Sequence, residues 1–166
     1  MLLRNVKLFF LAFWLGAAVF FSAVVAPGAF SVLRAFALPN ASEIAGTLVT
    51  RTLAIVNISG FVIGALLLVL ALIFRKHFGR RTVMLEVFSA TVLAFATGIG
   101  EWVIAARMRA LRISMVLPID QVSSDDARRM AFNDLHGYSV TALGIAMIAA
   151  LVAFVTIAYR ARLNTN

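Results

Sequence analysis

Four long apolar runs divide the chain, and each exceeds the roughly 20 residues that an α-helix needs to cross the hydrocarbon core of a bilayer. They lie at Leu8–Gly28, Thr52–Phe74, Val83–Ala106 and Leu135–Tyr159. Glu86 and Glu101, both in the third run, are the only charged residues inside them. None of the runs alternates with the period of two that membrane-spanning β-strands require. The pattern therefore predicts four transmembrane α-helices.

Polar residues between the runs indicate where these helices begin. Asn40 or Ser42 can cap a helix, and Glu43 suits the positive end of its dipole. The segment 123–126, Ser-Ser-Asp-Asp, repeats this chemistry, and Pro27 is expected to kink the first helix. We therefore expect one all-α domain over residues 1–166, an integral membrane four-helix bundle with long, partly kinked helices at about 8–34, 43–74, 83–112 and 125–160.

The composition agrees with a membrane protein and excludes several other classes. Hydrophobic residues make up 63% of the chain and charged residues 13%, whereas soluble domains carry about 25% charged residues. The absence of cysteine excludes disulfides and thiolate metal sites. The net charge of +8 comes from basic residues at the ends of the apolar runs. They suit anionic lipid headgroups, and no nucleic-acid-binding motif accompanies them.

The basic residues also bear on orientation. Eight lie on the side of the two termini and seven on the opposite side, so the totals nearly balance. The connection from Arg75 to Arg81, however, packs four of them into seven residues. Because dense positive charge favours the cytoplasmic side, we expect both termini there.

Uncommon polar residues gather at one depth of the predicted bundle, in its outer third on the side away from the termini. Such residues inside a membrane often mark a functional pathway. We therefore predict a polar cavity there, formed by Glu101, His136, Asn57, Asn133, Ser139, Arg107, Arg129 and Ser22.

Glu101 is the central residue of this hypothesis because a charged carboxylate within the membrane costs about 2.5–3.5 kcal/mol at mid-span. Arg107, Arg109 and His136 are candidate partners. One interpretation is a structural ion pair that fixes helix register. The other is a group that binds a proton or contacts a substrate.

Small residues indicate where the helices pack. Gly60 and Gly64 form a GxxxG motif, which lets two membrane helices approach closely. By the same reasoning we expect packing contacts at Gly98, Gly137 and Gly144.

His136 raises the question of a metal or cofactor. One histidine and one glutamate supply two ligands, fewer than the three or four that a zinc site needs. His77 falls in the connection near the termini, too far away to pair with His136 across the bundle. We therefore expect no metal and no cofactor. The chain also offers no nucleophile–base–acid set, so an enzyme is not expected.

Several short motifs resemble a known family. They are Trp14-Leu15-Gly16, Val25-Ala26-Pro27 with Phe30, Ala45-Gly46, and the segment 132–139, Phe-Asn-Asp-Leu-His-Gly-Tyr-Ser. Together they are similar to bacterial membrane proteins related to transmembrane protein 205, and more distantly to four-helix domains of the copper-resistance type. The resemblance implies a multi-pass protein of undefined molecular function in the bacterial inner membrane. Vertebrate members of that group are linked to the handling of platinum compounds, which implies a role in transport or trafficking. The chain departs from the copper-resistance domains because its spans lack a methionine or histidine cluster.

Three functional hypotheses follow. The first is a transporter-like or resistance-associated protein that uses the polar cavity for an unidentified small molecule or ion. The second is a structural or accessory subunit, a homo-oligomer or a partner of another membrane protein, whose polar cluster fixes helix packing. The third is a redox or metal-handling membrane protein.

Overall fold

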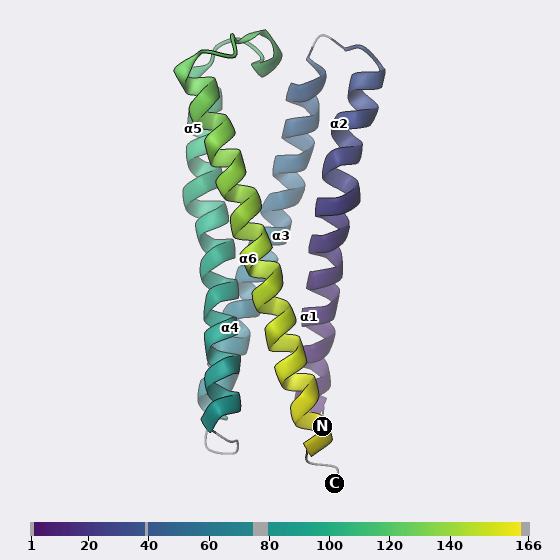
Figure 1. Ribbon diagram of the computed structural model, residues 1–166, viewed down its shortest axis with the longest axis vertical. Helices are drawn as coiled ribbons and strands as arrows, with labels where there is room; N and C mark the ends of the chain where they lie inside the picture. Colours follow the sequence, from purple (N-terminus) through teal and green to yellow (C-terminus); the bar gives the residue numbers. More distant parts are fainter. Residues whose placement is uncertain (1, 39, 75–79, 164–166) are drawn as a thin grey trace.

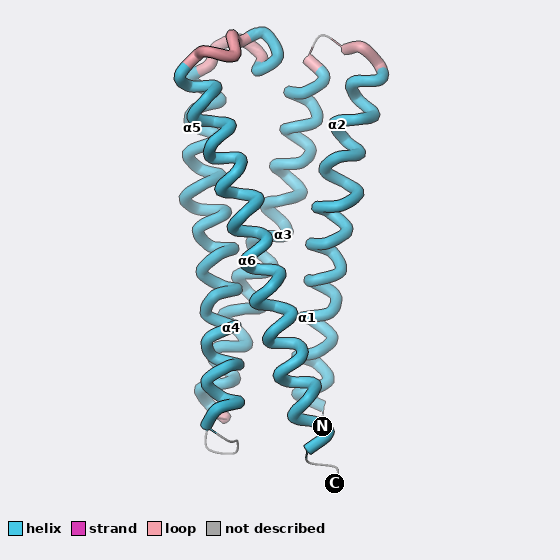
Figure 2. Tube along the Cα trace, viewed as in Figure 1, coloured by secondary structure: helices cyan, strands magenta, loops and turns pink. Residues whose placement is uncertain are grey.

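The computed structural model describes residues 2–38, 40–74 and 80–163. For residues 160–163 it describes the backbone alone. This part of the chain is almost entirely helical, with loops at the ends of the helices (Figure 2). Four helical segments are long and apolar enough to cross a membrane: Leu2–Ala35, Ala41–Ile73, Arg80–Ser114 and Ala127–Tyr159. The protein is thus an all-α membrane bundle.

Two of the four spans contain a wider π-helical turn. The first span comprises α1 (Leu2–Phe20), the π-helix η1 (Phe21–Val25) and α2 (Ala26–Ala35). The second is the continuous helix α3 (Ala41–Ile73). The third comprises α4 (Arg80–Gly98), the π-helix η3 (Ile99–Ala105) and α5 (Ala106–Ser114). A short 3₁₀ helix, η4 (Ile119–Gln121), precedes the fourth span, α6 (Ala127–Leu163).

The irregularity expected at Pro27 takes the form of η1, which ends two residues before this proline. Proline has no N–H for the helical bond to residue 23, and its ring crowds the carbonyl of that residue. A π-helical turn is one way for a helix to absorb such a disturbance. The π-helix η3 contains no proline, and it is not predicted from the sequence.

The four spans run alternately up and down, so both chain ends lie at the same end of the bundle (Figure 1). We call this the terminal end, and the opposite end, with residues 36–38, 40 and 115–126, the loop end. Helix α4 packs against α3 and α6, and α1 packs against α6. Farther along the first span, α2 packs against α3 instead. Figure 1 shows α2 running beside α3 and away from α6 toward the loop end.

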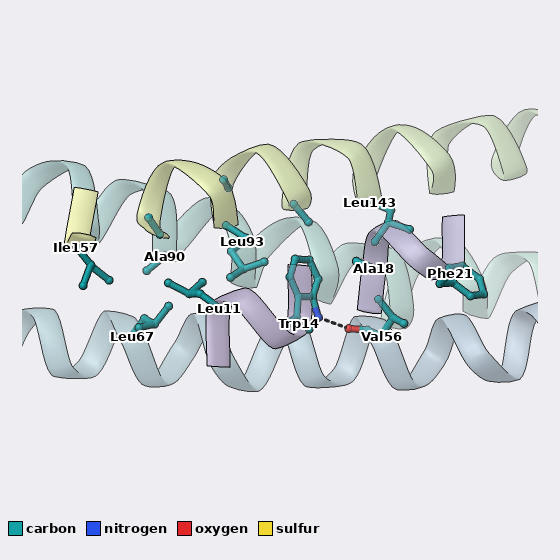
Figure 3. Packing of buried hydrophobic residues seen from close by; sticks show 14 of the residues in the cluster. Leu11, Trp14, Ala18, Phe21, Val56, Leu67, Ala90, Leu93, Leu143 and Ile157 are labelled. Carbon is teal, nitrogen blue, oxygen red and sulfur yellow. Dashed lines mark hydrogen bonds between the residues drawn. The ribbon is translucent and has the colours of Figure 1, made fainter. Parts of the chain in front are cut away.

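The interior combines two aromatic residues, Trp14 and Phe21, with leucines, valines and alanines. Trp14 of α1 is almost fully buried among Leu11, Leu93 and several alanines (Figure 3). Its indole N–H donates a hydrogen bond to the carbonyl of Val56, 2.9 Å away. Many large apolar side chains, among them Phe9, Phe13, Ile55, Phe88 and Phe95, are exposed on the outside. Lipid is the environment that suits such a surface.

The GxxxG glycines lie where helices approach most closely. A Cβ atom on Gly60 would stand 2.8 Å from Trp14, and one on Gly64 would stand 2.7 Å from the backbone nitrogen of Ala94. At Gly98 the nearest atom, in Phe61, would be 3.3 Å away. Gly137 and Gly144 have nothing within 4 Å of such an atom. The expectation of close packing at these last two glycines is corrected, because the face of α6 that carries them has no helix against it.

The two connections at the loop end are tied to each other. The backbone N–H of Ser42 donates to the Asp120 carboxylate at 3.1 Å, so α3 is capped by the other connection and not by its own Asn40 or Ser42 side chain. The carboxylate of Glu43 accepts hydrogen bonds from Nε of Arg112, the shorter at 2.7 Å. Asp126 caps α6 by accepting from the N–H of Arg128 at 2.8 Å.

Candidate polar site in the middle of the bundle

Glu101 lies in η3 and points into the bundle, with 7% of its surface exposed. It is thirteen residues before the end of α5 at Ser114, about 20 Å from that end at 1.5 Å per residue. Its Oε1 accepts a hydrogen bond from Nη1 of Arg109, 3.2 Å away. The Arg109 side chain is 48% exposed, so a cation at the surface reaches a carboxylate in the interior.

The π-helical turn accounts for the choice of partner. In a continuous α-helix, residues eight apart point about 80° away from each other. A π-helix bonds residue i to i+5 and therefore turns less per residue, which brings Glu101 and Arg109 toward one face. Arg107, the other arginine expected to pair with Glu101, is exposed and forms no ion pair within the described ranges.

Asn57 of α3 packs against Gly100, the residue that precedes Glu101. It is 3% exposed, and a Cβ atom on Gly100 would stand 3.2 Å from its amide nitrogen. The glycine next to Glu101 therefore makes room for the amide. In the part of the chain that the structure describes, the Asn57 side chain makes no hydrogen bond. The amide atoms are not fully inaccessible, so this unused hydrogen-bonding capacity can still meet water or another small polar group.

Ser139 adds a third polar group from a third helix. It is buried in α6, which packs against η3, and its hydroxyl likewise makes no hydrogen bond to a described residue. Ser139 lies twelve residues into α6, or about 18 Å from the loop end, and Asn57 lies sixteen residues into α3, or about 24 Å. A carboxylate, an amide and a hydroxyl thus come from three helices at a similar depth.

The other residues of the predicted cavity do not join this site. His136 and Asn133 are exposed on α6. The hydroxyl of Ser22 donates to the carbonyl of Ala18 in its own helix, and Arg129 donates to the carbonyl of Val122. The prediction that all eight residues form one cavity is therefore corrected. The early turns of α6 lack cover because α2, which would have to enclose His136, packs against α3.

Residues 9–116 match the profile of a protein family described as a domain of unknown function, DUF4149. The chain belongs to this family. The matched region includes Asn57, Gly100, Glu101 and Arg109 and ends before α6. No curated protein and no solved structure matches the chain. Neither the relation to transmembrane protein 205 nor the one to copper-resistance domains finds support in these comparisons.

The DUF4149 region contains a second buried carboxylate, Glu86 in α4. The ammonium group of Lys7 in α1 is 2.5 Å from its Oε1, and the two side chains are 10% and 3% exposed. From the sequence we expect the uncommon polar residues only toward the loop end. That expectation is corrected, because a buried ion pair lies toward the terminal end. Glu86 is the only acidic residue in the segments of the chain that form the terminal half of the bundle, and this could have suggested a pairing with a basic residue.

The described ranges contain no group of three or more histidine, cysteine or acidic residues that could hold a metal ion. Asn57, Ser139 and Glu101 instead offer hydrogen-bonding oxygens and one amide N–H₂ group. This donor set suits a proton, a water molecule or a small polar group.

Proposed function

We propose that this membrane protein is transporter-like and that Glu101 takes up and releases a proton in its working cycle. The observation that carries the proposal is the position of Glu101, a buried carboxylate in a π-helical turn whose described partner is a half-exposed arginine. π-Helical turns within α-helices are frequent at functional sites, and ionisable groups in membrane helices commonly mark proton or ion pathways.

The neighbouring groups support this chemistry. Arg109 reaches Glu101 from the surface through a single bond of 3.2 Å, and its exposed side chain can leave without breaking a helix. When it leaves, the carboxylate loses its only described counter-charge, and in the proposed cycle a proton takes the place of that charge. The Asn57 amide and the Ser139 hydroxyl have unused hydrogen-bonding capacity for the protonated acid or a water molecule.

The test uses the purified protein in liposomes adsorbed on a solid-supported electrode, with charge movement recorded after a pH jump. Wild type should give a transient current as Glu101 binds protons, and a sustained current when a transported solute is found by screening. Glu101→Gln should abolish the transient. Asp134→Asn, which removes an exposed carboxylate from α6, is the matched control and should keep it. Equal transients in wild type and Glu101→Gln would contradict the proposal.

A structural role is the second candidate, and the Glu101–Arg109 bond itself favours it. In that case Glu101→Gln and Arg109→Gln lower the stability of the bundle equally and leave the charge movement as it is in Asp134→Asn. Thermal denaturation beside the electrode measurement separates the two functions.

We also propose that the terminal end faces the cytoplasm of a bacterial cell. Because the chain has no cysteine, a single cysteine at Ser124 in the loop-end connection or at Asn5 near the terminal end gives a unique label. A membrane-impermeant maleimide added to whole cells should modify the cysteine at 124 and spare the one at 5. The opposite pattern would reverse the orientation.

A further inference from the structure

The charge of the protein is concentrated at one end. In the sequence, the terminal half carries eight basic residues and one acidic residue, Glu86, whereas the loop half carries seven basic and six acidic residues. Nearly all of the net charge of +8 therefore belongs to the terminal half. The loop end balances its arginines internally, as the Arg112–Glu43 and Arg128–Asp126 pairs show.

At the terminal end, one cation has a buried donor that nothing accepts. The Nε–H of Arg4 is inaccessible to solvent and makes no hydrogen bond, the only such atom in the described part of the chain. Arg4 lies one turn before Lys7 on the same face of α1. The Lys7 ammonium is 2.5 Å from the Glu86 carboxylate. Arg4, the other cation on this face, forms no ion pair with a described residue.

We infer that Arg4 forms the core of a binding site for a phosphate group at the terminal end of the bundle. The Nε–H is covered by protein atoms, but the two terminal nitrogens of the guanidinium make no hydrogen bond to a described residue and keep accessible surface, so they can bind the oxygens of a phosphate. Arg80 and Arg81, both exposed in the first turn of α4, add positive charge at the same end. Arg4 is the third residue of the first candidate membrane span, and lipid phosphates lie at the ends of such spans. An anionic phospholipid and a soluble phosphate both supply this chemistry.

The experiment measures ligand binding to the full chain purified in a non-ionic sugar detergent. Phosphatidylglycerol, phosphatidylcholine and inorganic phosphate are added separately, and bound ligand is counted by native mass spectrometry. Phosphatidylglycerol should bind wild type, and Arg4→Gln should weaken that binding about tenfold, the size expected for losing a charge-assisted hydrogen bond. Arg51→Gln, at an exposed arginine of the loop half, is the matched control and should bind as wild type does.

The outcomes test the inference and identify whether the phosphate belongs to a lipid or to a soluble ligand. Arg4-dependent binding of phosphatidylglycerol assigns the site to an anionic lipid, and Arg4-dependent binding of inorganic phosphate alone assigns it to a soluble ligand. Equal weakening in Arg4→Gln and Arg51→Gln would reduce the effect to overall charge and overturn the inference, as would unchanged binding in Arg4→Gln. If Arg4→Gln does not fold, Arg4→Lys keeps the charge and lacks the fork. It should bind several-fold more weakly, and wild-type affinity in Arg4→Lys would overturn the inference.

Discussion

The bundle buries two glutamates, and their surroundings differ in almost every respect. Glu86 faces a lysine that is itself nearly inaccessible, 2.5 Å away, and both groups belong to regular α-helices. Glu101 lies in a π-helical turn, 3.2 Å from an arginine that is half exposed, and the glycine before it packs against the buried Asn57. The first arrangement has both charges enclosed, whereas the second has one partner at the surface. The proposed function therefore assigns proton exchange to Glu101 and a structural role to Glu86.

The largest expected effect comes from breaking the enclosed pair. Lys7→Met breaks the buried ion pair with Glu86 and should cost roughly 3 kcal/mol or more of unfolding free energy, the size typical of removing one partner of such a pair. Unfolding by sodium dodecyl sulfate, followed by circular dichroism, measures the loss. Combining Lys7→Met with Glu86→Gln should recover part of it, since the buried side chain at position 86 then carries no charge. No recovery would mean that Lys7 acts by packing alone.

A second prediction concerns the close contact between α3 and α4, which holds both carboxylates in place. Gly64→Ala would put a methyl group 2.7 Å from the backbone nitrogen of Ala94, so the helices must move apart at a cost of about 1–3 kcal/mol. Gly144→Ala has open space around it and should be neutral or slightly stabilising. The same detergent titration compares them, and equal stability of the two variants would contradict the contact.

The Glu101 pair should contribute much less to stability than the Lys7 pair. Arg109 is half exposed, and ion pairs of that kind contribute about 1 kcal/mol or less. Arg109→Gln should therefore change the unfolding free energy by no more than this, while it alters the pH-jump current of the wild type. A loss as large as that of Lys7→Met would place both carboxylates in the same structural role.

The smallest effect is expected at Asp126, a carboxylate in water at the loop end. Hydrogen bonds from the side chain and backbone of Arg128 lower its pKa from 3.8 to about 2. Because the pKa is lower in the folded state, the cap stabilises α6 above pH 4 and is lost as the pH falls through about 2. Hydrogen exchange in the first turn of α6 should speed up across that range in wild type. In Asp126→Asn the exchange should not follow this pH dependence.

The sequence predicts the fold well because a membrane leaves little choice. Apolar runs of sufficient length must become helices, so the four spans could be read directly from the sequence, and Asn57, Glu101 and Ser139 could be selected as unusual polar residues. Their partners could not be predicted as well. The π-helical turn at η3 changes which arginine reaches Glu101. Because η3 contains no proline, this turn could not be predicted from the sequence.

Two further failures have the same origin, namely which helices become neighbours. His136 has the spacing of a buried residue, but α2 packs against α3 and leaves it exposed. Lys7 and Glu86 are 79 positions apart, and their pairing depends on α1 and α4 meeting across the interior. The spacing of residues along one helix predicts neither the exposure of His136 nor the pairing of Lys7 with Glu86.

The most direct measurement compares the two buried carboxylates within one sample. The chain has only three glutamates, Glu43, Glu86 and Glu101, so labelling the glutamate side-chain carboxyl with ¹³C gives three signals that single Gln substitutions can assign. In the folded protein in lipid nanodiscs, we expect the Glu101 signal to move as the pH is changed and the Glu86 signal to stay fixed. A fixed Glu101 signal, or a Glu86 signal that moves with it, would contradict the distinction between the two carboxylates.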